Sequence, residues 1–365
     1  MDFQLNEEQI AIRDMADSLF SDFTADEQLL AFTEAQNTVM QDAWDAAKET
    51  GLDLLFVPEV FGGSGLGMQE LSLVLIAQGA RLAQLPLWRN QVAVKILAEH
   101  ADCAALLESV ISDGALITTS HDAAFSAKGV QLTSHGDGTV SGQVHSVADV
   151  CHSRYALLTM QSGEQRGLVL VDLEDERVEA VPGVATHGGA VADLHLSNVT
   201  PLATLDNAAF NDLVVYSVAC LSSLQLGVSE RQLSRTVEYV NERVQFDRAI
   251  GTFQAVQMTL ADCYISIEAL RSCVWQLNYQ LDAGLPAYSE ALATAHHACE
   301  AGHFVSHKAQ HVHGGFGVDI SYPIYRFLYW SRDIRASLGG AQAVLAELGD
   351  WLTQNETLGW KYDLE

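Results

Sequence analysis

The sequence predicts a three-part fold: an N-terminal all-α domain over residues 1–108, a middle antiparallel β domain over 109–205 and a C-terminal four-helix bundle over 206–365. The main reason is that the apolar pattern changes along the chain, from a helical period to short strand-like runs and back to a helical period. The second reason is size, because 365 residues are too many for one ordinary core.

The N-terminal domain is predicted from apolar residues at helical spacing. These include Ile10, Met15, Leu19 and Phe20. Residues 71–83 (LSLVLIAQGARLA) form a candidate buried helix. Before it, residues 57–67 (VPEVFGGSGLG) predict a glycine-rich turn introduced by a proline.

The middle domain is predicted from short runs rich in Val, Leu and Thr, such as GTVSGQVH, YALLTM and RGLVLVDL. Polar, glycine-containing turns separate them, as at 134–138 and 161–165, which is the pattern of an antiparallel sheet. The C-terminal bundle is predicted from long helical stretches with short connections. These are residues 207–243, 252–284, 286–313 and 338–354.

Composition limits the function classes. A formal charge of −28 argues against nucleic acid or an anionic membrane as a partner. The acidic N-terminus does not resemble a signal peptide, and no apolar run reaches the length of a spanning helix, so a cytoplasmic protein is expected. The cysteines form no CxxC pair and are interpreted as small, buried, reduced residues. They are Cys103, Cys151, Cys220, Cys263, Cys273 and Cys299.

Three C-terminal segments carry the strongest functional pattern. They are ERVQFDRAIGTFQAVQ (242–257), AQHVHGGFGVDISYPIYRFLYWSRD (309–333) and SLGGAQAVLAELG (337–349). In this order and at these distances they resemble the acyl-CoA dehydrogenase family. The VPEVFGG turn resembles the family's loop near the flavin, and the helix–β–helix order matches its three-domain fold. The resemblance covers nearly the whole chain, and the middle domain matches least.

The first segment has a chemical rationale of its own. The guanidinium of Arg243 can clamp a pyrophosphate bidentately, while Phe246 offers a stacking face and Gln245 and Gln254 offer amides. The resemblance implies that such residues reach across a subunit interface to the ADP half of the neighbour's FAD. The alternative is an ordinary solvated helix end. Asp247 stands where the family usually has glycine and places a negative charge beside the clamp.

The second segment offers glycine backbone to a ligand. Gly314, Gly315 and Gly317 lack a Cβ, so their backbone can approach an anionic or planar group closely. His311 stands where the family commonly has Gln, and the resemblance places it with the flavin contacts. His313 and His311 are expected to have structural or hydrogen-bonding roles more than proton transfer. His303, His307 and His311 share a helical face, but no acidic partner motif accompanies them, so no metal is predicted.

The usual catalytic base is missing. The family's reaction removes the α-proton of an acyl-CoA thioester with a carboxylate while FAD accepts a hydride from the β-carbon. The resemblance places that carboxylate, usually a Glu, at Gly339 or at Ser217, and neither residue can act as a base. Residues 117–129 (ITTSHDAAFSAKG) also lack the family's flavin-holding Pro and Gly-Ser-Asp stretch. Thr118, Thr119 and Ser120 could offer hydroxyls, but residues of an edge strand are expected to face solvent more often than a ligand.

The pattern AQHVHGGFGVDISYPIYRF followed by SLGGA resembles the non-catalytic β subunit of bacterial α2β2 acyl-CoA dehydrogenases that act on steroid side chains of the cholesterol or bile-acid type, and such a subunit would explain these departures. The resemblance implies an α-type subunit that supplies the base, an acyl-CoA substrate dehydrogenated at C2–C3, and electron-transfer flavoprotein as acceptor. Two alternatives stay open. The chain is a self-sufficient flavoenzyme with a relocated base such as Asp333 or Glu230, or it is a flavin-free scaffold of the same fold.

Overall fold

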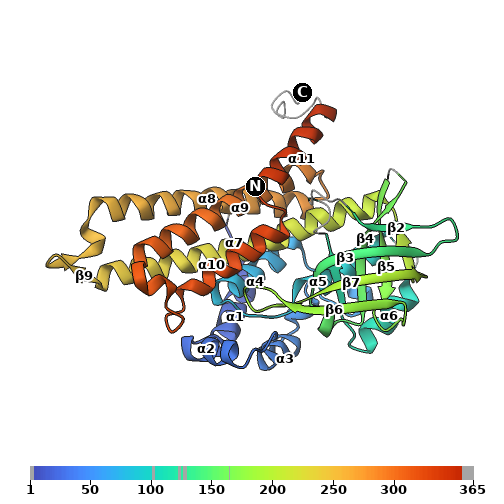
Figure 1. Cartoon of the computed structure of the whole chain (residues 1–365), viewed down its shortest axis with the longest axis horizontal. Helices are drawn as coiled ribbons and strands as arrows, with labels where there is room; N and C mark the ends of the chain where they lie inside the picture. Colours follow the sequence, from blue (N-terminus) through green and yellow to red (C-terminus); the bar gives the residue numbers. More distant parts are fainter. Residues whose placement is uncertain (1–3, 101–102, 122–124, 126–129, 164, 356–365) are drawn as a thin grey trace.

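The computed structural model describes residues 4–100, 103–121, 125, 130–163 and 165–355. It confirms the helical, β, helical order of the chain. Figure 1 shows the sheet at one end of an elongated molecule and the long C-terminal helices extending to the other. The N-terminal helices lie along one side and contact both parts.

The N-terminal domain consists of α1 (Glu7–Phe23), α2 (Asp26–Glu34), α3 (Gln41–Glu49), α4 (Met68–Arg81), α5 (Trp88–His100) and α6 (Ala104–Ser112). α1 begins where the Asn6 side chain accepts a hydrogen bond from the backbone N–H of Gln9, whose side chain in turn accepts one from the Asn6 N–H. The predicted buried helix is α4, and it starts three residues before the predicted residue 71.

The middle domain is one twisted sheet of β1 (Ile117–Ser120), β2 (Leu132–Ser134), β3 (Val140–Ala148), β4 (Tyr155–Ser162), β5 (Gln165–Asp172), β6 (Val178–Val184), β7 (Ala190–Val199) and β8 (Ala203–Leu205). Most pairs are antiparallel, but β1 and β2 both pair with β4 in parallel. The expectation that Thr118, Thr119 and Ser120 face solvent was wrong. They are 1–3 % exposed, because β1 lies against the helical domain instead of forming a free edge.

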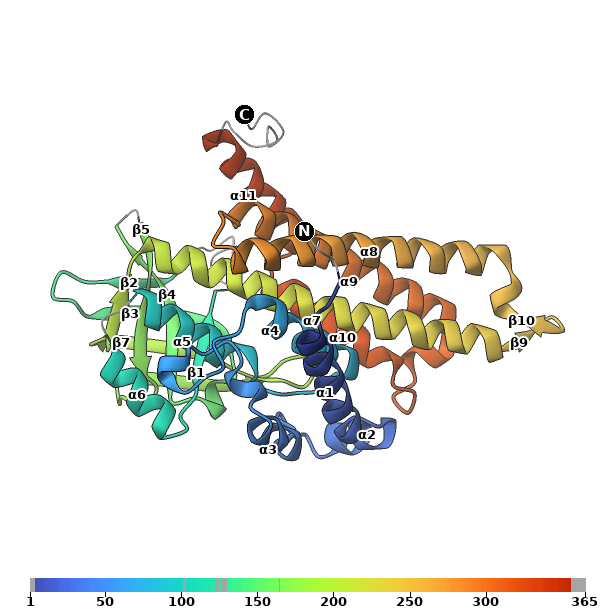
Figure 2. The ribbon, with the colours of Figure 1, turned by 180° about the vertical axis from the view of Figure 1, so that it is seen from behind.

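The C-terminal domain contains α7 (Asn207–Glu242), α8 (Gln254–Asp282), α9 (Tyr288–His313), α10 (Ile324–Ser337) and α11 (Ala341–Gln354). The fourth bundle helix is α10, which was not among the predicted stretches. The predicted 338–354 stretch forms α11, which points away from the bundle (Figures 1 and 2). α10 was missed in the prediction because the glycines of the 309–333 motif and Pro323 interrupt the helical pattern just before the helix starts.

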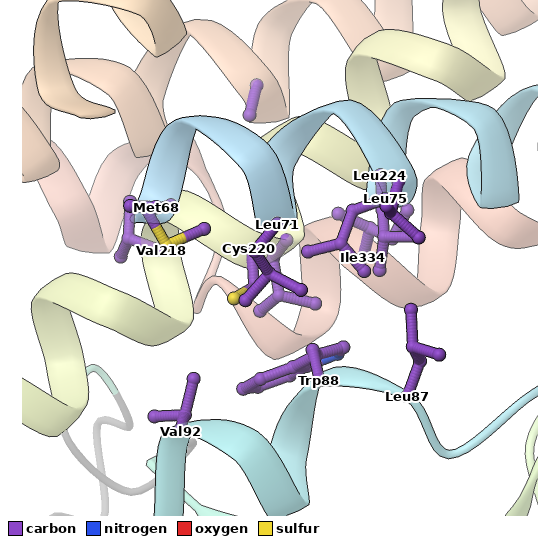
Figure 3. Packing of buried hydrophobic residues seen from close by; sticks show 14 of the residues in the cluster. Met68, Leu71, Leu75, Leu87, Trp88, Val92, Val218, Cys220, Leu224 and Ile334 are labelled. Carbon is purple, nitrogen blue, oxygen red and sulfur yellow. The ribbon is translucent and has the colours of Figure 1, made fainter. Parts of the chain in front are cut away.

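The N- and C-terminal domains share one hydrophobic core, and the sheet has a second. Figure 3 shows Met68, Leu71 and Leu75 of α4 facing Val218, Cys220 and Leu224 of α7. Two glycines allow the backbones to approach. A Cβ on Gly79 would lie 2.2 Å from the Leu224 carbonyl oxygen, and one on Gly227 would lie 1.9 Å from that of Ile76. α4 and α7 therefore act as one packed unit across the domain boundary.

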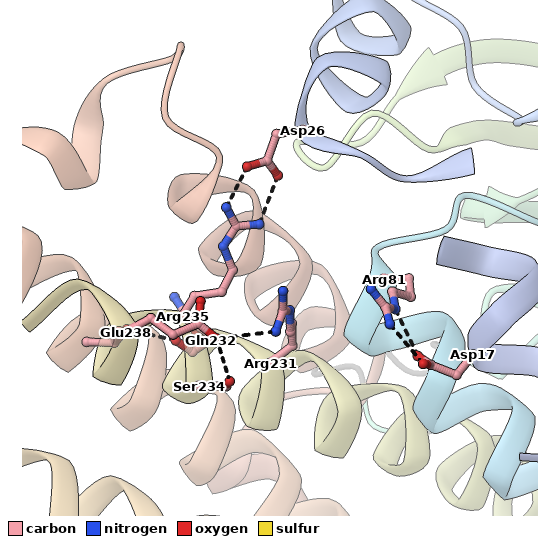
Figure 4. A network of polar contacts seen from close by, with 9 residues as sticks. Asp17, Asp26, Arg81, Arg231, Gln232, Ser234, Arg235 and Glu238 are labelled. Atoms are coloured by element: carbon pink, nitrogen blue, oxygen red, sulfur yellow. Dashed lines mark hydrogen bonds and ion pairs between the residues drawn. The ribbon is translucent and has the colours of Figure 1, made fainter. Parts of the chain in front are cut away.

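Ion pairs also join the helices. Arg235 of α7 binds Asp26 of α2 through two hydrogen bonds of 2.6 and 2.9 Å, and Arg81 holds Asp17 in the same bidentate way (Figure 4). These hydrogen bonds keep the pKa of both carboxyl groups below the usual value. The Asp26–Arg235 pair links the first helices of the chain to the bundle.

α7 is long and apolar enough to cross a membrane, with a mean hydropathy of 1.4 over its best window, but 89 % of that window is buried inside the fold. It is the one helix in the described part of the chain that passes this test, and its burial identifies it as the core helix of the bundle. Cys220, Cys263 and Cys299 are buried, as expected. Cys151 is exposed, contrary to that expectation, because it lies in a short 3-10 turn after β3.

Candidate functional site

The residues predicted to contact a cofactor gather at the free end of the bundle. α7 ends at Glu242, and a two-stranded hairpin, β9 (Val244–Gln245) and β10 (Arg248–Ala249), leads into α8. Its tip is formed by Phe246 and Asp247, which both have positive φ, 56° and 62°. Figure 1 shows this hairpin projecting beyond the helices. A positive φ is energetically unfavourable for residues other than glycine. In this hairpin it places the ring of Phe246, which is 86 % exposed, at the tip.

Arg243 lies where the first two motifs meet. Its guanidinium carbon is 5.7 Å from the ring centre of Phe316, in the 3-10 turn Gly314–Val318 that follows α9. Within the described residues it forms no ion pair, so the negative charge of Asp247 does not neutralise it. The fold brings a whole set of exposed residues to this end. They are Arg243, Gln245, Phe246, Gln254, His311, Gly314 and Gly315.

The glycines in the second motif have different roles. Gly314 has φ 59° and ψ −131°, a conformation that side chains disfavour, and Gly315 faces open space. Gly317 is instead buried, and a Cβ there would lie 2.5 Å from the side-chain oxygen of Gln310. The expectation that Gly317 offers its backbone to a ligand was therefore wrong, because tight packing already explains this glycine.

His313 is part of the packing beneath this end. Its ring stacks on Tyr239 at 4.3 Å between centroids, and its Nδ1 lies 2.8 Å from the Ala309 carbonyl oxygen. Burial lowers its pKa, so the ring stays neutral at pH 7. His311, by contrast, is exposed. The end of the bundle thus carries a cation without a carboxylate partner, an exposed aromatic ring, amides and open backbone, a donor set that fits the ADP half of FAD.

A second candidate site is a cavity of about 760 Å³ between the sheet and the helical domains. Ser120 and Thr159 line it from the sheet, Trp88 and Arg89 from α5, and Leu224 from α7. The loop before α11 completes the wall with Gly339, one of the two positions where a catalytic carboxylate was considered. This cavity is large enough to be considered as a flavin site formed by the chain itself.

Neither considered base position can hold a carboxylate at the cavity. A Cβ on Gly339 would lie 2.3 Å from the Cβ of Phe125, and the φ of 75° is itself unfavourable for a side chain. Ser217 is fully buried within α7, and its hydroxyl oxygen is enclosed. Phe125 therefore occupies the space that a glutamate side chain would need.

The two carboxylates considered as relocated bases lie in different surroundings. Asp333 lines the cavity, with its Oδ1 3.2 Å from Nδ1 of His187. Glu230 does not line the cavity. Its Oε1 is 2.7 Å from Nη1 of Arg271, and burial raises its pKa.

No sequence pattern indicated several of the polar residues that line the cavity. Arg89 forms a 3.2 Å ion pair with Asp149 and lies 4.5 Å from the ring centre of Trp88. His187, from the loop between β6 and β7, contacts both Asp333 and Gln84. These residues come from five separate segments, so no spacing pattern could group them. Throughout the described residues no three His, Cys, Asp or Glu side chains form a group that could hold a metal ion.

Comparison with known proteins identifies the class. Residues 6–103 match the model of the acyl-CoA dehydrogenase N-terminal domain, and residues 216–351 match that of the C-terminal domain. The chain belongs to the acyl-CoA dehydrogenase family, FAD-dependent oxidoreductases that act on CH–CH bonds. Neither model covers residues 104–215, the part of the chain in which the resemblance was weakest.

Individual relatives are more specific. The chain is 29 % identical to acyl-CoA dehydrogenase FadE27 of Mycobacterium tuberculosis, over 97 % of this chain and 99 % of the relative. Among solved structures, the Tcur3481–Tcur3483 steroid ACAD is 34 % identical, with a TM-score of 0.87, over 95 % of this chain and 98 % of that one. The ChsE4–ChsE5 complex of Mycobacterium tuberculosis is 28 % identical, with a TM-score of 0.88, over 97 % and 100 %.

Proposed function

We propose that this chain is the non-catalytic subunit of a heteromeric, FAD-dependent acyl-CoA dehydrogenase that acts on a bulky acyl-CoA of the steroid side-chain type. One observation carries the proposal. The chain keeps an open bundle end where Arg243 has no carboxylate partner among the described residues, while Phe125 closes the space at Gly339 where a catalytic carboxylate would stand. Such a chain can complete a partner's flavin site without running the reaction in its own cavity.

Exposed apolar side chains support a partner subunit. They lie at the hairpin, on the first half of α8 and in the turn after α9, and a monomer seldom leaves so many uncovered. They are Val244 (55 % exposed), Phe246 (86 %), Met258 (59 %), Tyr264 (58 %), Ile265 (65 %), Phe316 (46 %), Val318 (77 %) and Ile320 (72 %). They surround the proposed cofactor contacts, so a partner that covers them would bring its own flavin site to Arg243.

The similar structures support the assembly and the substrate class. Two of them carry names that pair two components, ChsE4–ChsE5 and Tcur3481–Tcur3483, and the second is described as a steroid ACAD. We infer a partner of the α type, a heterotetramer of two copies of each chain, and a role in the breakdown of a cholesterol-like side chain. Electron-transfer flavoprotein is the proposed electron acceptor, in a cytoplasmic setting.

In this proposal the residues of the chain bind and orient, and they transfer no proton from the substrate. Arg243 holds the pyrophosphate, Phe246 covers the adenosine, and the amides of Gln245 and Gln254 donate hydrogen bonds to it. His311 and the backbone of Gly314 and Gly315 complete the contact. When bound, FAD supplies the hydride acceptor for the β-carbon. A carboxylate of the partner removes the α-proton.

The test is to express the chain alone and together with a candidate α-type subunit, and to record the visible spectrum and acyl-CoA dehydrogenase activity of each preparation. The chain alone should be colourless and inactive, and the co-purified complex should be yellow and active with a steroid-type acyl-CoA. A yellow, active chain alone would instead favour the self-sufficient enzyme, with Asp333, one of the two carboxylates that line the cavity, as its candidate base. Absence of flavin in both preparations would leave only the scaffold interpretation.

Restoring a glutamate at the considered base position should not create activity. We expect Gly339→Glu to leave the chain alone inactive and to destabilise it by about 2–3 kcal/mol, because the new side chain collides with Phe125. Gly340→Glu is the matched control, since Gly340 has a similar φ of 82° but open space around its Cβ position. Urea denaturation and the activity assay measure both effects. Dehydrogenase activity in Gly339→Glu alone would show that the cavity holds flavin and substrate after all.

A further inference from the structure

We propose that the groove between α9 and α10 is a binding site for a phosphoryl group, separate from the bundle end and from the cavity beside the sheet. The groove is a hollow of about 220 Å³. α9 lines it with His303, Ser306 and His307, and α10 lines it with Ser331, Arg332 and Arg335. No carboxylate lines it, although the chain has 47 acidic and only 19 basic residues. Asp333 lies on the other cavity.

The two arginines of the groove are unusual in this chain. Among the arginines of the described residues, Arg332 and Arg335 are the two that neither pair with a carboxylate nor lie over a Phe, Tyr or Trp ring. Arg335 approaches only the ring of His303, at 3.5 Å. The remaining arginines all have such a partner. They are Arg13, Arg81, Arg89, Arg154, Arg177, Arg231, Arg235 and Arg271, which pair with acids, and Arg166, Arg243, Arg248 and Arg326, which lie over rings.

Two histidines add hydrogen-bonding groups to the groove. The rings of His303 and His307 lie on successive turns of α9, with centroids 4.4 Å apart. Burial lowers the pKa of His307, and the neighbouring His303, Arg332 and Arg335 lower it further. Two guanidinium groups and two imidazole rings therefore face one hollow that no carboxylate lines. An anion between them would replace mutual repulsion by charge-assisted hydrogen bonds.

Size and geometry suit a phosphoryl group. Planar guanidinium groups match two phosphate oxygens at once, and imidazole N–H groups can donate to the others. The hollow of about 220 Å³ has room for a tetrahedral anion and several waters, each of which takes about 30 Å³. A metal cation is disfavoured by the same charges. The phosphoryl group can come from free orthophosphate or from a nucleotide, and both share this chemistry.

The experiment is isothermal titration calorimetry of the full chain, with sodium phosphate titrated at constant ionic strength. We expect saturable binding that weakens at least tenfold in the double variant Arg332→Gln/Arg335→Gln. The matched control is Arg154→Gln/Arg177→Gln, which removes two exposed guanidiniums from the middle domain. This control should bind like the parent. Unchanged melting temperatures establish that the variants are folded.

A second titration with ADP identifies the source of the phosphoryl group. It is made in an Arg243→Ala background, so that the proposed flavin contact at the bundle end does not contribute. ADP binding at least tenfold tighter than phosphate assigns the groove to a nucleotide, and equal or weaker binding assigns it to free phosphate. The proposal is overturned if neither probe binds saturably, or if the groove variant and the control lose binding equally. Either result leaves the proposed subunit role untouched.

Discussion

Replacing Arg243 by alanine in the co-purified complex is expected to weaken FAD binding about ten- to hundredfold. The guanidinium has no carboxylate partner in the described part of the chain, so its charge is free to meet a pyrophosphate. A charge-assisted hydrogen bond of this kind contributes about 1.5–3 kcal/mol. The flavin-to-protein ratio after gel filtration, from the visible spectrum, measures the loss, and added FAD should partly restore activity.

Arg248→Ala is the matched control. It removes the same charge from the same hairpin, but its guanidinium carbon lies 4.0 Å from the ring centre of Phe253, so it is engaged within the chain. Its flavin content should stay near that of the parent complex. Unchanged flavin in Arg243→Ala, or equal losses in both variants, would mean that Arg243 is not the pyrophosphate clamp.

Gly227→Ala is expected to destabilise the chain by about 3 kcal/mol, a large effect for one added methyl group. The new Cβ would lie 1.9 Å from the carbonyl oxygen of Ile76 and 2.9 Å from the backbone nitrogen of Ala80. Backbone atoms cannot rotate aside, so α4 and α7 would have to separate and open the core they share. The midpoint of urea denaturation should fall accordingly.

A glycine-to-alanine substitution at a position with open space should change the stability of the chain in the opposite direction. Gly349 lies within α11, and a Cβ there would meet nothing within 4 Å. Gly349→Ala should therefore stabilise the chain by up to about 1 kcal/mol, because alanine has the higher helix propensity. If both variants shift the midpoint alike, close approach of α4 and α7 is not what holds the N-terminal domain to the bundle.

Predictions from the sequence were reliable for elements whose formation depends on the residues of a single segment. The three-part order and the helices α4, α7, α8 and α9 follow from apolar spacing within each stretch, and the structure confirms them. The motifs around Arg243 and Gly314 lie on helix ends, where the residue types themselves fix what the backbone offers. The fourth bundle helix was misplaced because a glycine-rich turn precedes α10 and an ordinary apolar period marks α11.

Contacts between segments that lie far apart in the chain could not be predicted from the sequence. The burial of Thr118 and Ser120 depends on β1 lying between β4 and α5, and the packing role of Gly317 depends on Gln310. The pairing of His187 with Asp333 joins the sheet to α10, and the groove of Arg332 and Arg335 needs α9 and α10 side by side. None of these contacts leaves a spacing pattern in one stretch of chain.

By itself the sequence determined the order of the domains, the family and the absence of a carboxylate at Gly339 and Ser217, since each of these depends on residue type and local period. Only the tertiary structure decided that Phe125 fills the space beside Gly339, that Arg243 lies against Phe316 at the bundle end, and that two domains share one core. The physical reason is that the sequence gives the type of each side chain directly, whereas the space and the charges around that side chain depend on segments far away in the chain.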